Sequence, residues 1–108
     1  MIISIDYDDT YTRDKILWDS FIKQAKQRGH TVYCVTARSR PYDSIEVEND
    51  LEHLVDRIFF TAGTPKEAYM FKQGICVQVW IDDSVRSILP VHRVNEWGED
   101  YNDYTEGK

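Results

Sequence analysis

Three aspartates stand within four positions near the start of the chain. Asp6, Asp8 and Asp9 directly follow the short apolar run at residues 1–5. Two carboxylates about 4 Å apart repel each other by on the order of 4 kcal/mol at the effective dielectric of a protein surface. The cluster therefore predicts a bound cation, a shared proton or full exposure to water.

Other polar residues that could do chemistry stand at three further points of the chain. Thr36 ends an apolar run, Lys66 lies in the segment "TPKE", and Asp82 and Asp83 end another apolar run. Each has an ordinary structural role when taken singly: a strand-end threonine, a solvated lysine, or a pair of helix-capping aspartates. A shared function requires that the fold brings them together.

The elements that must position these residues alternate along the chain. The expected strands are residues 1–5, 31–36, 57–60, 76–81 and 91–94. The expected helices are residues 13–28, residues 41–55 and a third that begins at "TPKE" and ends near Gly74. Thr64, Pro65 and Glu67 predict a capping box at the start of this third helix.

This alternation is typical of a parallel sheet that is covered on both faces. Right-handed crossovers then predict an α/β fold: a doubly wound, Rossmann-like three-layer sandwich with a five-stranded, mainly parallel sheet. Ligands of such folds bind beyond the carboxyl ends of the strands. The polar clusters all follow strands or begin a helix, so we expect them at one edge of the sheet: Asp6, Asp8, Thr36, Lys66, Asp82 and Asp83.

Composition indicates one small globular domain. Of 108 residues, 42% are hydrophobic, and the net charge is −6. We expect a core domain at residues 1–94 and an acidic tail at 95–108, which contains five acidic residues and one lysine. The lack of a basic stripe argues against tight non-specific binding of nucleic acid. No apolar run is long enough to cross a membrane, and no signal peptide is visible. Cys34 and Cys76 fall in expected strands, which predicts buried, reduced thiols and a cytoplasmic location.

Four segments resemble the four motifs of the haloacid dehalogenase (HAD) superfamily, over residues 2 to about 94. They are "IDYDDT", "VTAR", Lys66 at a helix start, and "WIDD". The resemblance implies a Mg²⁺-dependent phosphomonoester hydrolase (a phosphatase) that works through an aspartyl-phosphate intermediate. Asp6 would be the nucleophile, which is already ionised at neutral pH, and Asp8 the general acid and base.

The same resemblance implies the other site residues. Asp6, Asp82 and the main-chain carbonyl of Asp8 would hold Mg²⁺, with help from Asp83, since hard oxygen ligands are those that Mg²⁺ prefers. Thr36 and Lys66 would bind the phosphoryl group. Arg38, just after Thr36, could reach a substrate phosphate.

The chain departs from the family pattern at its start and in its length. Asp9 stands where a glycine is usual, and Tyr11 where a small aliphatic residue is usual. The 27 residues between Asp8 and Thr36 and the 29 between Thr36 and Lys66 leave no room for a cap domain. An open site suits a large substrate, such as a phosphorylated macromolecule end. Alternatively, a second subunit of a homo-oligomer could cover a small phosphomonoester or nucleotide.

Two other functions remain open on these residues. The first is a non-catalytic HAD-like module that binds Mg²⁺ or phosphate, which Asp9 favours. The second is a metal-dependent nuclease with a carboxylate cluster for two ions, formed by Asp6, Asp8, Asp82 and Asp83. Hydrolysis of para-nitrophenyl phosphate with Mg²⁺ separates the hydrolase from the first, and degradation of oligonucleotides would identify the second.

Overall fold

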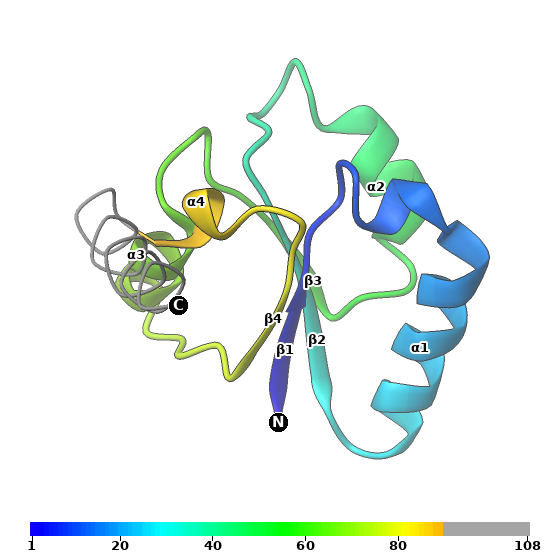
Figure 1. Cartoon of the computed structure of the whole chain (residues 1–108). Helices are drawn as coiled ribbons and strands as arrows, with labels where there is room; N and C mark the ends of the chain where they lie inside the picture. Colours follow the sequence, from blue (N-terminus) through cyan, green and yellow to red (C-terminus); the bar gives the residue numbers. More distant parts are fainter. Residues whose placement is uncertain (90–108) are drawn as a thin grey trace, which may run out of the picture.

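The computed structural model describes residues 1–89 (Figure 1). Its strands are β1 (Ile2–Ile5), β2 (Thr31–Thr36), β3 (Arg57–Phe60) and β4 (Val79–Ile81). Its helices are the 3-10 helix η1 (Tyr11–Arg13), α1 (Lys15–Gln27), α2 (Ile45–Leu51), α3 (Lys66–Lys72) and α4 (Val85–Ile88). The expected strand 91–94 and the acidic tail lie outside the described residues.

The described strands form one all-parallel sheet in the order β3-β2-β1-β4. Ile5 of β1 pairs with Cys34 of β2 and with Ile81 of β4, so these strands end nearly level. Segments that follow β1, β2 and β4 therefore leave the sheet at the same edge. The parallel, Rossmann-like fold is confirmed, with four described strands where five were predicted.

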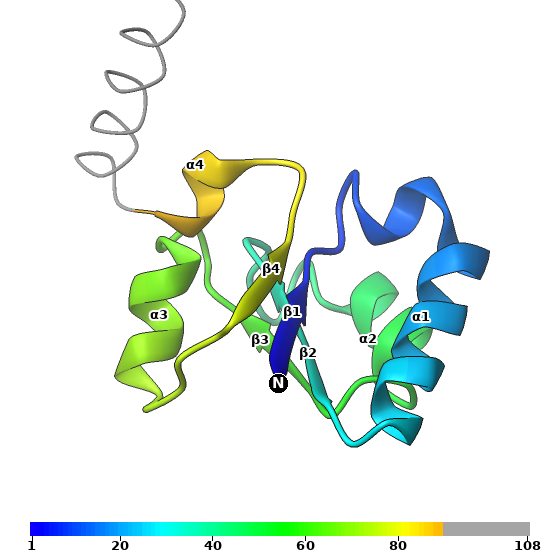
Figure 2. The same cartoon turned by 60° about the horizontal axis from the view of Figure 1, so that its bottom comes forward.

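Helices cover both faces of the sheet (Figures 1 and 2). α1 and α2 lie on one face, and α3 and α4 lie on the other. On the first face Ile5, Ile22 and Leu51 belong to the larger buried cluster. On the second face a smaller cluster contains Val35, Phe59 and Met70. Burial of these apolar side chains on both sides holds the strand ends in place.

The first helix agrees closely with the prediction. The Asp14 side chain caps α1 by accepting a hydrogen bond from the Leu17 N–H at 3.1 Å. Gly29, with φ of 88°, follows the end of the helix in the left-handed conformation that glycine tolerates. None of the helices in residues 1–89 has the length and apolar character that crossing a bilayer requires.

The second helix is shorter than predicted. α2 occupies Ile45–Leu51 within the expected range 41–55. Residues 41–43 form a turn instead and Ser44 is the N-cap residue of the helix; the Asp43 N–H donates to the Ser39 carbonyl at 3.1 Å. Beyond the helix, the N–H groups of Leu54 and Val55 both donate to the Leu51 carbonyl. The apolar stripe is nevertheless buried as expected, because turns also direct Leu54 and Val55 to the core.

Three local predictions on the second face are wrong. α3 begins at Lys66 with Pro65 as its N-cap residue, and no side chain provides the cap hydrogen bond that the capping box predicted. β4 begins at Val79 rather than at residue 76. Before the strand, Ile75 and Val77 pack against the cluster that contains Met70 of α3, and the Ile75 N–H donates to the Met70 carbonyl. Cys76 is consequently exposed, whereas Cys34 is buried as predicted.

Candidate active site

A buried lysine joins two aspartates at the carboxyl edge of the sheet. The Nζ of Lys66 donates to Asp6 Oδ1 at 2.8 Å and to Asp82 Oδ2 at 2.6 Å. The three side chains are 1%, 8% and 3% exposed, respectively. A buried ammonium or carboxylate is costly unless it is paired and hydrogen-bonded. We call these three residues the buried triad.

The buried triad changes the proton affinity of its members. Burial raises the pKa of the Asp6 carboxyl from 3.8 to about 6, although Lys66 opposes this rise. Burial alone would lower the pKa of Lys66, but its hydrogen bonds to Asp6 and Asp82 outweigh that effect and raise it. Lys66 is therefore cationic at neutral pH, where Asp6 is mostly ionised.

Thr10 connects Asp6 to a third aspartate. Its hydroxyl lies 3.1 Å from Asp6 Oδ2 and 3.3 Å from Asp83 Oδ1, and it accepts a hydrogen bond from the Asp83 N–H at 3.1 Å. A hydroxyl has a single proton to donate, so it can serve only one of the two carboxylates at a time. Sequence reasoning missed this role, although Thr10 ends the same "IDYDDT" segment that contains the nucleophile candidate.

Three carboxylates lie close enough to bind one metal ion. Oxygen atoms of Asp6, Asp82 and Asp83 all lie within 4.8 Å of one another. An all-oxygen, all-carboxylate donor set suits a hard divalent cation such as Mg²⁺. The donor set therefore fits the Mg²⁺ ion that the family resemblance implies. The three aspartates form a candidate metal site, and the identity of its ion is not assigned.

Asp82 also keeps the local structural role that its position after β4 allows. Its Oδ1 accepts a hydrogen bond from the Ser84 N–H at 3.0 Å, and the Ser87 hydroxyl lies 3.3 Å from each carboxylate oxygen. Ser84 is the N-cap residue of α4. The turn into α4 thus orients Asp82 toward Lys66, so the structural and functional interpretations of this aspartate are compatible.

A small cavity of about 190 Å³ opens beside the buried triad. Its walls include Asp6, Asp8, Lys66, Asp82 and Asp83. Ala37, from the loop that follows β2, completes the wall on that side. Side chains from Asp6 to Ser87, which are 81 residues apart in sequence, therefore meet in one acidic cavity, which has room for a phosphate group.

Asp8 is held by an arginine at this cavity. Arg38 donates from Nε to Asp8 Oδ2 at 2.9 Å and from Nη2 to Asp8 Oδ1 at 2.8 Å. These hydrogen bonds lower the pKa of Asp8. Arg38 was predicted to reach a substrate phosphate, and the structure directs its guanidinium to Asp8. The pairing was not visible in the sequence, because it depends on how two separate loops meet.

Thr36 lies at the end of β2 and is completely buried. Its Oγ1 accepts a hydrogen bond from the Arg38 N–H at 3.3 Å. In the part of the chain that the structure describes, the lining of the acidic cavity contains the following residue, Ala37, and not Thr36. Thr36 thus supports the loop at the cavity, one residue away from its wall.

The loops after β2 and β3 are joined by main-chain hydrogen bonds. The N–H groups of Thr61, Ala62 and Gly63 donate to the carbonyls of Thr36, Arg38 and Ala37, respectively. Ala62 and Gly63 both have positive φ, 52° and 84°, which turns the chain into α3. This connection fixes the backbone that carries Arg38 against the segment that leads to Lys66.

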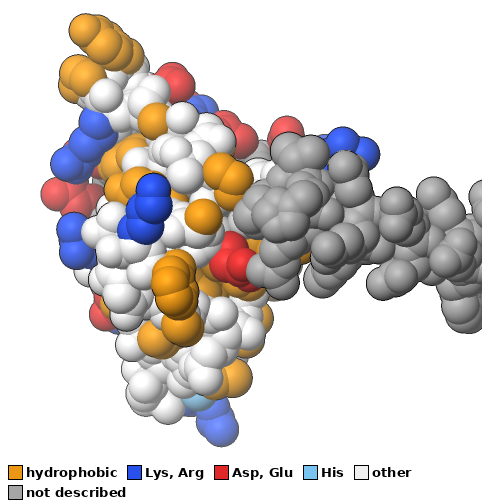
Figure 3. All heavy atoms as spheres, turned by 90° about the vertical axis from the view of Figure 1, so that its left-hand side faces the viewer, with side chains coloured by type: hydrophobic (Ala, Val, Ile, Leu, Met, Phe, Trp, Pro, Cys, Tyr) orange, Lys and Arg blue, Asp and Glu red, His pale blue; other side chains and the backbone are white. Residues whose placement is uncertain are grey.

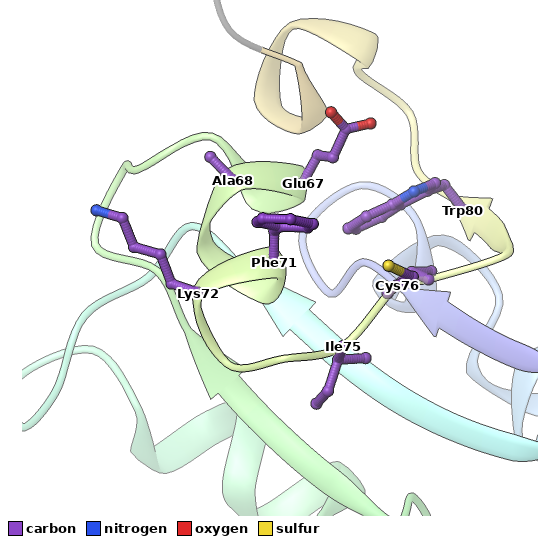
Figure 4. Close-up of a pocket in the computed structure, with 8 residues that line it drawn as sticks. Glu67, Ala68, Phe71, Lys72, Ile75, Cys76 and Trp80 are labelled. Atoms are coloured by element: carbon purple, nitrogen blue, oxygen red, sulfur yellow. The ribbon is translucent and has the colours of Figure 1, made fainter.

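A larger hollow of about 500 Å³ lies between α3 and β4 and has a different character. Phe71 projects from α3 toward Trp80 of β4 (Figure 4), and the other walls are mainly apolar. It shares no lining residue with the acidic cavity. Figure 3 shows this side of the molecule, where hydrophobic side chains are mixed with lysine and arginine. The chemistry that the sequence predicts therefore concerns the smaller, acidic cavity.

Comparison with known proteins adds no relative. No protein-family model matches the chain, and neither the curated proteins nor the solved structures that were searched contain a match. What the chain can do must therefore be argued from its own residues. They form a small α/β domain with a four-stranded parallel sheet and three aspartates that could bind a metal ion.

Proposed function

We propose that the protein is a Mg²⁺-dependent phosphomonoester hydrolase that acts through an aspartyl-phosphate on Asp6. The observation that carries the proposal is the buried triad, in which Lys66 contacts both Asp6 and Asp82 beside a small acidic cavity. Its members are the residues that resemble motifs of the HAD superfamily. The arrangement supplies a carboxylate nucleophile, a cation for the phosphoryl oxygens and ligands for a metal ion.

In the first step, a carboxylate oxygen of Asp6 attacks phosphorus and forms a new O–P bond. The bond between phosphorus and the ester oxygen breaks, and the protonated form of Asp8, which pairing with Arg38 disfavours, gives its proton to that oxygen, so that an alcohol leaves. In the second step, water attacks phosphorus while Asp8 takes one of its protons. The bond to Asp6 then breaks, which releases inorganic phosphate and restores the carboxylate.

The remaining residues bind and orient the phosphoryl group. Lys66 would pair with its oxygens, and the hydroxyl of Thr36 would need a small local adjustment to reach them, since Ala37 lines the wall. Asp6, Asp82 and Asp83, with the Asp8 carbonyl, would hold Mg²⁺. When bound, the ion would neutralise charge that the clustered carboxylates and the phosphate share.

The exposure of the acidic cavity to solvent affects which kinds of substrate could bind there. Asp8 is half exposed, and only short loops separate the strands from the helices around it. A phosphorylated macromolecule end could cover the cavity itself, or a second copy of the chain could cover a small phosphomonoester. Turnover of a panel of both kinds of substrate decides between these versions.

The test uses the purified full chain with para-nitrophenyl phosphate, in Mg²⁺ and in EDTA. We expect turnover in Mg²⁺ that EDTA and Asp6→Asn both abolish. Asp14→Asn is the matched control, because asparagine caps a helix as well as aspartate and α1 should remain intact. Activity of Asp6→Asn close to that of the unsubstituted protein would rule out the mechanism.

A non-catalytic module that binds Mg²⁺ or phosphate is the second candidate. The observation that favours it is the bidentate pair of Asp8 with Arg38, which engages the carboxylate that catalysis requires. The same pair disfavours a two-metal nuclease, because Asp8 is then less available as a metal ligand. Binding of Mg²⁺ or inorganic phosphate without turnover of any phosphomonoester would support the module.

A further inference from the structure

The hollow between α3 and β4, which we call the apolar hollow, is lined by side chains that folded domains usually cover. Its volume is about 500 Å³, against about 190 Å³ for the acidic cavity. Phe71 and Trp80 face each other across it (Figure 4), and Ile75 and Val77 form further apolar walls. The Phe71 side chain is nevertheless 71% exposed. A concave apolar surface of this kind is typical of a docking site.

The strand beside the apolar hollow is incompletely covered as well. β4 is an end strand of the described sheet, and its outer edge has no strand partner among residues 1–89. All three of its residues are only partly buried, whereas three of the four residues of β1 are buried. Val79 and Ile81 pack toward the first face and Trp80 toward the second. An unpaired edge with apolar side chains favours association with another segment.

The chain itself continues from a point close to the apolar hollow. The described part ends at Leu89, directly after α4, and α4 packs against α3 (Figure 2). An extended chain advances at most about 3.6 Å per residue, so Trp97 can lie up to about 29 Å from Leu89, whereas the seven residues of α3 span only about 10 Å. Residues 90–97 are therefore long enough to reach any part of the hollow.

The segment that follows Leu89 has a composition that matches the hollow. Val91, Val94 and Trp97 supply apolar side chains, and residues 98–108 contain four acidic residues and one lysine. Lys72 belongs to the wall of the hollow, is exposed and forms no ion pair with another described residue. Apolar side chains thus have an apolar wall to contact, and the acidic residues beyond them have a cation nearby.

We propose that residues 91–97 of the same chain dock in the apolar hollow, with the Trp97 ring against Phe71 and Trp80. Aromatic rings bury a large area and favour one another as partners, which makes Trp97 the main anchor. The docked segment would hold α3 against β4. These two elements carry Lys66 and lead to Asp82, so docking would also support the buried triad. The inference goes beyond the proposed function and does not depend on it.

Cys76 provides a native reporter for this docking. Its thiol is exposed in the described part of the chain and belongs to the wall of the hollow, whereas Cys34 is buried. These are the two cysteines of the sequence. A segment that docks in the hollow should shield Cys76 from an alkylating reagent, and Cys34 should react only when the whole domain unfolds.

The experiment measures alkylation of each cysteine by iodoacetamide in the full chain, by mass spectrometry. Trp97→Ala should raise the alkylation rate of Cys76 at least about 5-fold and leave Cys34 unmodified. Val94→Asp should act in the same direction, because it would bring an unpaired carboxylate into an apolar hollow. Tyr104→Ala is the matched control: it removes an aromatic ring beyond residues 91–97 and should leave the rate within about twofold.

Three results would overturn the proposal. The first is an equal rate at Cys76 in the unsubstituted protein, Trp97→Ala and Val94→Asp. The second is equal acceleration at Cys34 and Cys76, which would show unfolding of the domain and no selective uncovering of the hollow. The third is protection of Cys76 that grows with protein concentration, which would identify a second copy as the occupant. Because the readout needs no turnover, this inference and the proposed function can fail separately.

Discussion

Lys66 and Asp82 are in contact through Nζ and Oδ2 at 2.6 Å, and this pair joins the start of α3 to the end of β4. Both side chains are at most 3% exposed. Removing one member of a buried ion pair leaves its partner charged and unpaired, which typically costs about 3–5 kcal/mol. The stability of the domain should therefore depend strongly on Lys66.

Lys66→Met tests this dependence, since methionine fills a similar volume without charge. We expect the free energy of unfolding in EDTA at neutral pH to fall by about 3–5 kcal/mol, measured by urea denaturation. Lys72→Met, at an exposed position of the same helix, should change it by less than about 0.5 kcal/mol. Added Mg²⁺ should return part of the loss, because a divalent cation can neutralise the same aspartates. Equal stability of the two variants would contradict the assignment.

The three clustered aspartates should bind a divalent ion. Asp83→Asn removes one carboxylate from the cluster without changing its shape, so we expect Mg²⁺ affinity to fall at least about tenfold, measured by calorimetry. Glu52→Gln removes an exposed charge just beyond α2 and should leave the affinity unchanged. Similar losses in both variants would indicate only a general attraction of cations to an acidic protein.

The stability of the metal-free protein should depend on pH through Asp6. The pKa of Asp6 is raised from 3.8 to about 6 by burial, so the folded protein binds this proton more tightly than the unfolded chain does. Its stabilising contribution is fully present below about pH 4 and is lost as the pH rises through 6. In EDTA, the free energy of unfolding should therefore fall less between about pH 4 and 7 in Asp6→Asn than in the unsubstituted protein. Parallel pH profiles would show that Asp6 titrates normally.

The Tyr7 hydroxyl should contribute to stability and little to catalysis. It donates to Asp50 Oδ2 at 2.6 Å, and Lys15 pairs with the same oxygen at 2.9 Å. Tyr7→Phe removes the hydrogen bond and keeps the ring under Arg38, so we expect a loss of about 1–2 kcal/mol in unfolding free energy. Tyr42→Phe is the control, because Tyr42 is 93% exposed. A catalytic defect without a stability defect in Tyr7→Phe would point to a more direct role.

The sequence predicts the bounds of two strands correctly. β2 and β3 have the predicted bounds, because β-branched, aromatic and other apolar residues form all of β2 and all of β3 after Arg57. α2 and β4 are shorter than predicted. At residues 41–44 and 75–77 the chain remains partly apolar, but turns and packing against α3 take the place of regular structure. A hydrophobic pattern reports burial, and burial does not require a helix or a strand.

In the candidate site, the positions of the residues along the backbone could be predicted from the sequence, but the contacts of their side chains could not. Topology places Asp6, Lys66 and Asp82 at one edge, since parallel strands send their carboxyl ends to the same side. The partners of individual side chains depend on rotamers and on how loops meet. For that reason the Arg38–Asp8 pair and the bridging role of Thr10 were not predicted.

The members of the buried triad lie directly after the first strand, at the start of α3 and directly after the last described strand. A growing polypeptide therefore has no complete site until β4 has joined the sheet and brought Asp82 into place, and Asp6 lacks its ion-pair partner until Lys66 has been added. Any ion or phosphate that occupies this cavity should bind only the completed domain, and by mass action it should draw late, nearly assembled chains toward the native state.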